Sequence, residues 1–138
     1  MHGKKSKMKI EFFHEFVPPK TTVQERRQNK SGGYLHNAGR IAKATWRAVL
    51  EQYRPAQTLE GPVELTVIIT WPHTKASQKQ NNGLSVPKTT RPDGDNLVKM
   101  IKDVMTLLGY WKDDAQVYSE TIERWHGEIP GVAVKIKN

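Results

Sequence analysis

Four aspartates in the second half of the chain have a spacing suited to binding a divalent cation. Asp93 and Asp95 stand two residues apart, and Asp113 and Asp114 stand together farther along. Mg²⁺ is commonly held by one or two carboxylates, with waters and phosphate oxygens completing its shell. In phosphodiester hydrolysis such an ion activates water and neutralises charge on the phosphoryl group. These aspartates are therefore candidate metal ligands.

Each of these side chains also has a local structural interpretation. Asp95 suits a helix N-cap, Asp93-Gly94 suits a turn, and Asp113-Asp114 suits a turn that enters a strand. Lys99 follows Asp95 by one helical turn, so it is either an ordinary ion-pair partner or a group that holds phosphate and stabilises the leaving oxygen. In a cation-rich chain, four acids beside a polyanion site would repel it unless a cation lay between them, which favours the metal interpretation.

The charge of the chain indicates a polyanionic partner. Lys and Arg number 22 against 14 Asp and Glu, a net charge of +8, and most of the excess lies in residues 1–60. A basic domain without membrane features most simply meets nucleic acid, the alternative being a cationic surface that only confers solubility. We therefore expect a nucleic-acid partner, with no membrane and no small-molecule substrate.

Composition excludes several other classes. The chain has no cysteine, which removes disulfides, thiolate metal sites and cysteine nucleophiles, and which suits a reducing cytoplasm. No apolar run approaches the ~18–20 residues that span a bilayer. The segment MHGKKSKMKI has no apolar stretch of signal-peptide length behind it. We expect a cytoplasmic protein whose residues 1–138 form a single domain.

Hydrophobic periodicity predicts an α+β fold. The expected order is strand, helix, strand, long loop, helix, strand, strand, over residues 9–13, 37–54, 63–71, 72–92, 96–108, 116–125 and 132–137. Pro55 and Gly109 end the two helices. The last two strands follow each other directly and suggest an antiparallel hairpin. This favours a mixed sheet with two helices packed on it over a doubly wound fold.

Basic residues fall in three predicted segments: a polar arm or loop over 20–36, one face of the helix 37–54, and the loop 72–92, which we expect to lack periodic structure. Such residues would grip nucleic acid through its phosphates, without reading bases. The candidates are Lys20, Arg26, Arg27, Arg40, Lys43, Arg47, Lys75, Lys79, Lys88 and Arg91.

Two acidic motifs resemble those of the RusA-type Holliday junction resolvases of bacteria and lambdoid prophages. They are Pro92-Asp93-x-Asp95-Asn96-Leu97-x-Lys99 and Trp111-x-Asp113-Asp114-x-Gln116-Val117. Weaker likenesses lie at Pro18-Pro19-Lys20, Gly61-Pro62-Val63 and Pro130-Gly131-Val132. Gly94 departs from the apolar residue expected between the first two aspartates.

This resemblance implies a homodimeric α+β endodeoxyribonuclease that resolves four-way DNA junctions by paired symmetric nicks, in recombination and repair. By motif position, Asp93, Asp95 and Asp114 would bind Mg²⁺, with Mn²⁺ as an alternative and Asp113 in support. Lys99 would be the essential lysine. The rival hypothesis is a non-catalytic nucleic-acid-binding module whose acidic residues are helix caps and turns.

The separation of the two motifs poses a geometric question. A helix over 96–108 is ~20 Å long, so Asp114 starts far from Asp93. Residues 109–114 span at most ~20 Å when extended, so a return within one subunit would be nearly taut. Either the helix is shorter than predicted, or Asp114 completes a site across a dimer.

Overall fold

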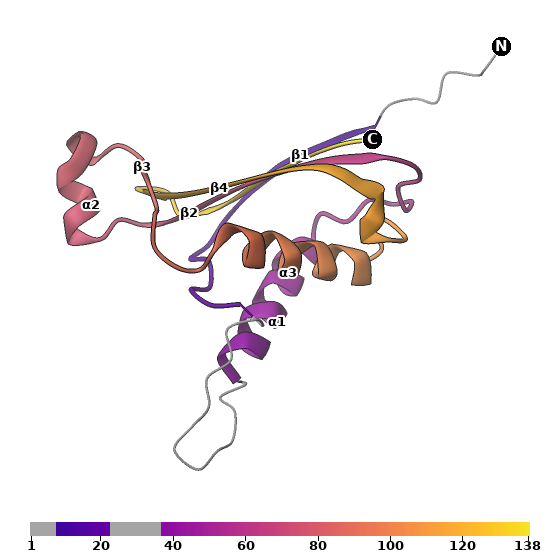
Figure 1. Ribbon diagram of the computed structural model, residues 1–138, viewed down its shortest axis with the longest axis horizontal. Helices are drawn as coiled ribbons and strands as arrows, with labels where there is room; N and C mark the ends of the chain where they lie inside the picture. Colours follow the sequence, from indigo (N-terminus) through magenta and orange to yellow (C-terminus); the bar gives the residue numbers. More distant parts are fainter. Residues whose placement is uncertain (1–7, 23–36) are drawn as a thin grey trace.

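The structure is a computed structural model that describes residues 8–22 and 37–138, and it contains a five-stranded sheet in the order β1-β5-β2-β4-β3 (Figure 1). β2 pairs in parallel with β4, whereas the pairs β1·β5, β2·β5 and β3·β4 are antiparallel. The predicted mixed sheet is therefore confirmed. The strands are β1 (Lys9–Glu15), β2 (Val63–Pro72), β3 (Val86–Pro87), β4 (Val117–Gly127) and β5 (Gly131–Lys137).

Two long helices, α1 (Asn37–Glu51) and α3 (Gly94–Leu107), lie on the same side of the sheet (Figure 1). The predicted apolar faces are the buried ones, with Ala42 and Trp46 on α1 and Leu97, Ile101 and Val104 on α3. The α+β architecture follows from these two patterns, since each helix has one apolar stripe to bury against the sheet. Among the described residues, no helix has both the length and the apolar character needed to cross a bilayer.

β2 occupies the centre of the sheet and supplies much of the core. Its residues Val63, Leu65, Val67, Ile69 and Trp71 are buried, alternating with half-buried residues on the opposite face. The alternation is that of a strand with one face packed on helices and the other open. The strand predicted over 63–71 is confirmed.

The hairpin predicted for the last two strands is wrong. β4 and β5 are consecutive in the chain, but β2 lies between them and pairs with both. The connection passes the end of β2, where Thr70 pairs with Gly131 and Pro72 with Gly127. The physical reason is burial: the β-branched, apolar strand β2 gains most from neighbours on both edges.

The segment 72–92 was expected to lack periodic structure, and this is also wrong. It contains a short helix α2 (Lys75–Lys79), a 3-10 turn (Gln80–Gly83) and β3. Thr74 and Ser77 form a capping box, while the two ring nitrogens of His73 contact Ser77 Oγ at 2.9 Å and Gly83 O at 2.8 Å. These polar contacts order the segment without a hydrophobic period.

The basic arm predicted over 20–36 falls mostly outside the described residues. Lys20 is described and exposed, but Arg26 and Arg27 are not among the residues that the structure describes.

The close approach of β1 and β5 yields a first prediction. A Cβ on Gly131 would lie 2.4 Å from the backbone O of His14 and 2.6 Å from Phe13 Cζ. Gly131→Ala should therefore lower the free energy of unfolding by about 1–3 kcal/mol, measured by urea denaturation. Ser119→Ala on β4 is the control and should change it little; equal stability of the two variants would contradict the packing described here.

Candidate active site

The start of α3 presents two carboxylates to solvent. Asp93 is the N-cap residue and Asp95 lies in the first turn, so the prediction of Asp95 as the cap, with a helix beginning at Asn96, is wrong by two residues. Asp93 makes no side-chain capping hydrogen bond, and both aspartates are exposed. The positive end of the helix dipole favours anions here. A purely structural role would therefore leave both carboxylates without a specific hydrogen bond.

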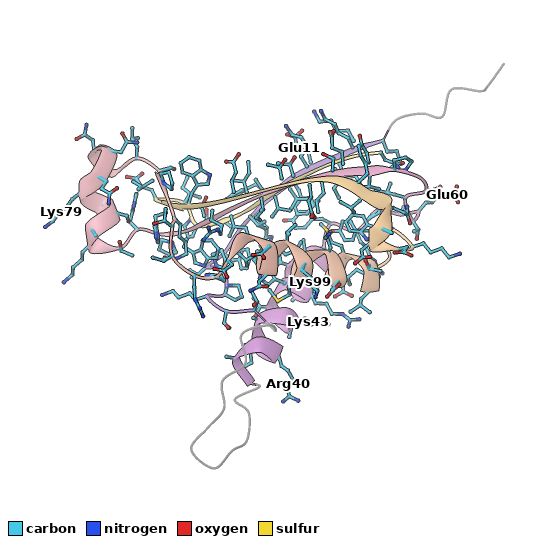
Figure 2. The ribbon with its side chains drawn as sticks, in the orientation of Figure 1. Glu11, Arg40, Lys43, Glu60, Lys79 and Lys99 are labelled. Carbon is cyan, nitrogen blue, oxygen red and sulfur yellow. The ribbon has the colours of Figure 1, made fainter. Side chains whose placement is uncertain are left out.

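Lys99 is exposed on the same helix, one turn after Asp95. The ion pairs found among residues 8–22 and 37–138 include Lys102 with Glu120 at 2.9 Å but not Lys99 with Asp95. Figure 2 shows Lys99 on α3 and Lys43 on α1, both on the helical side of the molecule. The helix thus holds Lys99 in position, and its predicted partner Asp95 does not neutralise its charge.

The second acidic motif forms a 3-10 turn, Asp114–Gln116, that leads into β4. Asp113 Oδ1 accepts a hydrogen bond from Ala115 N at 2.8 Å, and Gln116 Oε1 accepts one from Asp113 N at 3.1 Å. Asp113 therefore caps the 3-10 turn, which is the turn entering a strand that the local interpretation expected. Asp114 is exposed and lies outside these contacts.

The two motifs lie at opposite ends of α3. Gln116 Nε2 donates to the backbone O of Leu59 and of Gly61, both at 3.0 Å, which fixes the turn near the start of β2. The start of α3 lies instead beside the later part of β4, since a Cβ on Gly94 would be 3.3 Å from Ile122 Cγ2. α3 has 14 residues, hence a length of about 21 Å.

One chain therefore does not assemble the predicted set of ligands. The helix is not shorter than expected, and no group of three or more His, Asp and Glu residues gathers to hold a metal in the described part of the chain. Asp114 instead borders a shallow pocket of about 440 Å³ together with Lys43, Asp103 and Lys112. The helix is therefore as long as the sequence predicted, and a shortened helix does not bring Asp114 to Asp93 and Asp95.

The remaining basic candidates are distributed over several elements. Arg40 and Arg47 are exposed on α1, Lys75 and Lys79 on α2, and Arg91 in the segment before α3. Lys88 differs from them because it is buried, with 9% of its surface exposed. Burial lowers the pKa of Lys88, and the charges of Arg124 and Lys20 lower it further.

Arg124 is a residue that the sequence pattern did not single out. From β4 its Nη1 donates to the backbone O of Thr90 at 2.6 Å and of Pro92 at 3.1 Å. It thereby ties the segment just before Asp93 to the sheet. The pattern of β4 gave no signal for this, because a lone arginine in a half-exposed strand normally faces solvent.

Comparisons with known proteins identify relatives over most of the chain. Residues 17–137 match the family described as "Endodeoxyribonuclease RusA". The chain is 34% identical over 112 residues to a protein of Lactococcus phage r1t named "Crossover junction endodeoxyribonuclease rusA", covering 80% of this chain and 83% of that one. It is 38% identical over 96 residues to "Uncharacterized protein YqaN" of Bacillus subtilis (strain 168), covering 64% and 66% of the two chains. This chain belongs to the RusA endodeoxyribonuclease family.

Proposed function

We propose that this protein resolves four-way DNA junctions by paired symmetric nicks, as a Mg²⁺-dependent endonuclease of recombination and repair in the cytoplasm. The observation that carries the proposal is the pair of exposed carboxylates, Asp93 and Asp95, on a rigid helix start in a strongly basic chain. The similarity to the phage crossover junction endodeoxyribonuclease supports the same substrate.

The residues at the start of α3 suit the proposed metal. Mg²⁺ is bound through one or two carboxylates and keeps waters and substrate phosphates as further ligands. Asp93 and Asp95 supply two carboxylates with no ion pair among the described residues. Mn²⁺ accepts the same oxygen ligands. When bound, the ion would activate water and neutralise phosphoryl charge.

The chain's own cations would hold the substrate. Lys99, on the helix that carries both aspartates, would stabilise charge on the leaving oxygen. The basic side chains of the chain would contact the arms of the junction through phosphates and set its position without reading sequence. We assign this role to Lys20, Arg26, Arg27, Arg40, Lys43, Arg47, Lys75, Lys79, Lys88 and Arg91.

A homodimer accounts for the separation of the two motifs. In an isologous pair, each subunit can place its Asp114 at the other's Asp93 and Asp95, because the same two surfaces meet twice. Such a dimer would carry two sites, related by a two-fold axis, for the two strands to be cut. Asp113 would support its neighbour by fixing the 3-10 turn.

The rival hypothesis makes all four acids structural. Asp113 fits it, through its bond to Ala115 N, whereas Asp93 makes no such bond. The two hypotheses differ in what the removal of one charge at the start of α3 should do.

Asp95→Asn should abolish Mg²⁺-dependent cleavage of a synthetic four-way junction, while junction binding is kept or tightened because an anion facing phosphate is lost. The measurement is a cleavage gel with and without Mg²⁺, with a linear duplex alongside and binding followed in EDTA. Glu60→Gln, which removes an exposed acid before β2, is the matched control. Cleavage by Asp95→Asn at the wild-type rate, or none by the wild type, would refute the proposed function.

A mixing experiment tests the shared site. Asp95→Asn and Asp114→Asn proteins should each be inactive, yet after subunit exchange the mixed dimer should nick one strand. In that dimer one site combines both changes and the other combines two intact aspartates. If each site were built within one subunit, both sites of the mixed dimer would be defective. Continued inactivity of heterodimers, purified with two different tags, would therefore contradict completion across the dimer.

A further inference from the structure

Two cations face each other across the edge of the sheet where α3 begins. Pro87 pairs with Trp125, and Lys88 N donates to the backbone O of Arg124 at 2.9 Å. Lys88, the residue directly after β3, therefore continues the antiparallel register and lies opposite Arg124 of β4. Like charges in this position destabilise a sheet, so the pair has an energetic cost that a purely structural role would not require.

The surroundings of Lys88 do not neutralise its charge. Lys88 Nζ donates to Thr90 Oγ1 at 2.6 Å and lies 5.3 Å from the centre of the Trp71 ring. Neither Lys88 nor Arg124 belongs to any ion pair among the described residues. The contact with Trp71 offsets part of the cost, but an apolar side chain of the same length would pack there with no charge to desolvate.

A third cation is held close to this pair. Trp71 Nε1 donates to the backbone O of Pro18 at 3.0 Å and of Pro19 at 3.3 Å, which fixes the chain just before Lys20. The charge of Lys20 acts on Lys88, as does that of Arg124. Three segments far apart in the sequence thus bring together Lys20, Lys88 and Arg124, which we call the cation cluster.

The cation cluster borders the first acidic motif. Arg124 Nη1 donates to the backbone O of Pro92, the residue before Asp93. A Cβ on Gly94 would lie 3.6 Å from Arg124 Nε, so the guanidinium lies against the first residue of α3. Both side-chain hydrogen bonds of Arg124 in the described part of the chain come from Nη1, which leaves Nη2 as a donor for a ligand.

We propose that Lys20, Lys88 and Arg124 form a phosphate-binding pocket that holds the DNA backbone phosphate next to the one at Asp93 and Asp95. A phosphate group would supply the negative charge that the cation cluster lacks, through charge-assisted hydrogen bonds to Lys88 Nζ and the Arg124 guanidinium. The pocket deepens the proposed function and rests on it. In this proposal Lys88 positions the DNA strand at the site, whereas the exposed basic residues are general phosphate contacts.

The test is Lys88→Met, which keeps an unbranched side chain against Trp71 and removes the charge together with the hydrogen bond to Thr90 Oγ1. Its affinity for a synthetic four-way junction in EDTA should fall about ten-fold or more. The slope of log affinity against log salt should become shallower by about one, the contribution of one phosphate contact. Its Tm should be unchanged or higher, because a buried charge opposite Arg124 is gone. Lys135→Met is the matched control and should bind like the wild type; Lys135 is a half-buried lysine 3.7 Å from Glu11 on the open face of the sheet.

A second arm uses inorganic phosphate in place of DNA. Phosphate should raise the Tm of the wild type more than that of Lys88→Met, at equal ionic strength in chloride. Unchanged junction affinity in Lys88→Met, or an equal phosphate shift in both proteins, would overturn the pocket and leave Lys88 a packing residue. If the wild type bound no junction at all, the proposed function would fail, while the phosphate arm would still decide the pocket.

Discussion

Two neighbouring parallel strands must be joined by a crossover segment, which carries the chain from the carboxyl end of the first strand back to the amino end of the second. In this protein β2 and β4 are such a pair, and α3 is the returning segment. α3 begins beside the middle of β4, against Ile122 and Arg124, and finishes near the amino ends of the two strands. Asp93 and Asp95 therefore lie at the first end of α3, and Asp114 lies beyond its second end. This separation makes a second subunit part of the proposed chemistry.

Near the start of α3, acidic and basic side chains lie close to one another without forming ion pairs. Asp93 and Asp95 make no ion pair among the described residues, and neither do Lys88 and Arg124, although Arg124 contacts the residue just before Asp93. A fold optimised for stability alone would pair or remove such charges. In our account the acids bind a divalent cation and the cation cluster binds a phosphate, so that the polyanionic substrate completes both sites.

The sequence predicted the elements that depend on hydrophobic period and missed those that depend on long-range pairing or local polar contacts. The apolar faces of α1 and α3 and the alternation of β2 led directly to the core. The position of β5 beside β2 could not be inferred, because two consecutive strands suit a hairpin equally well. α2 depends on the contacts of His73, Thr74 and Ser77, which have no periodic signature. At the candidate site, the motif spacing predicted Asp93 and Asp95 as ligands, whereas the opposition of Lys88 and Arg124 appeared only with the strand register.

In the proposed site, the carboxylates at the start of α3 bind a divalent cation. The most direct measurement is paramagnetic line broadening of backbone amides by substoichiometric Mn²⁺. We expect Mn²⁺ to broaden the amide signals of Gly94, Asp95 and Asn96, together with those of residues around Asp114 in the dimer. This broadening should be lost in an Asp93→Asn, Asp95→Asn double variant. Broadening that spares the start of α3, or that persists unchanged in the double variant, would contradict the proposed site.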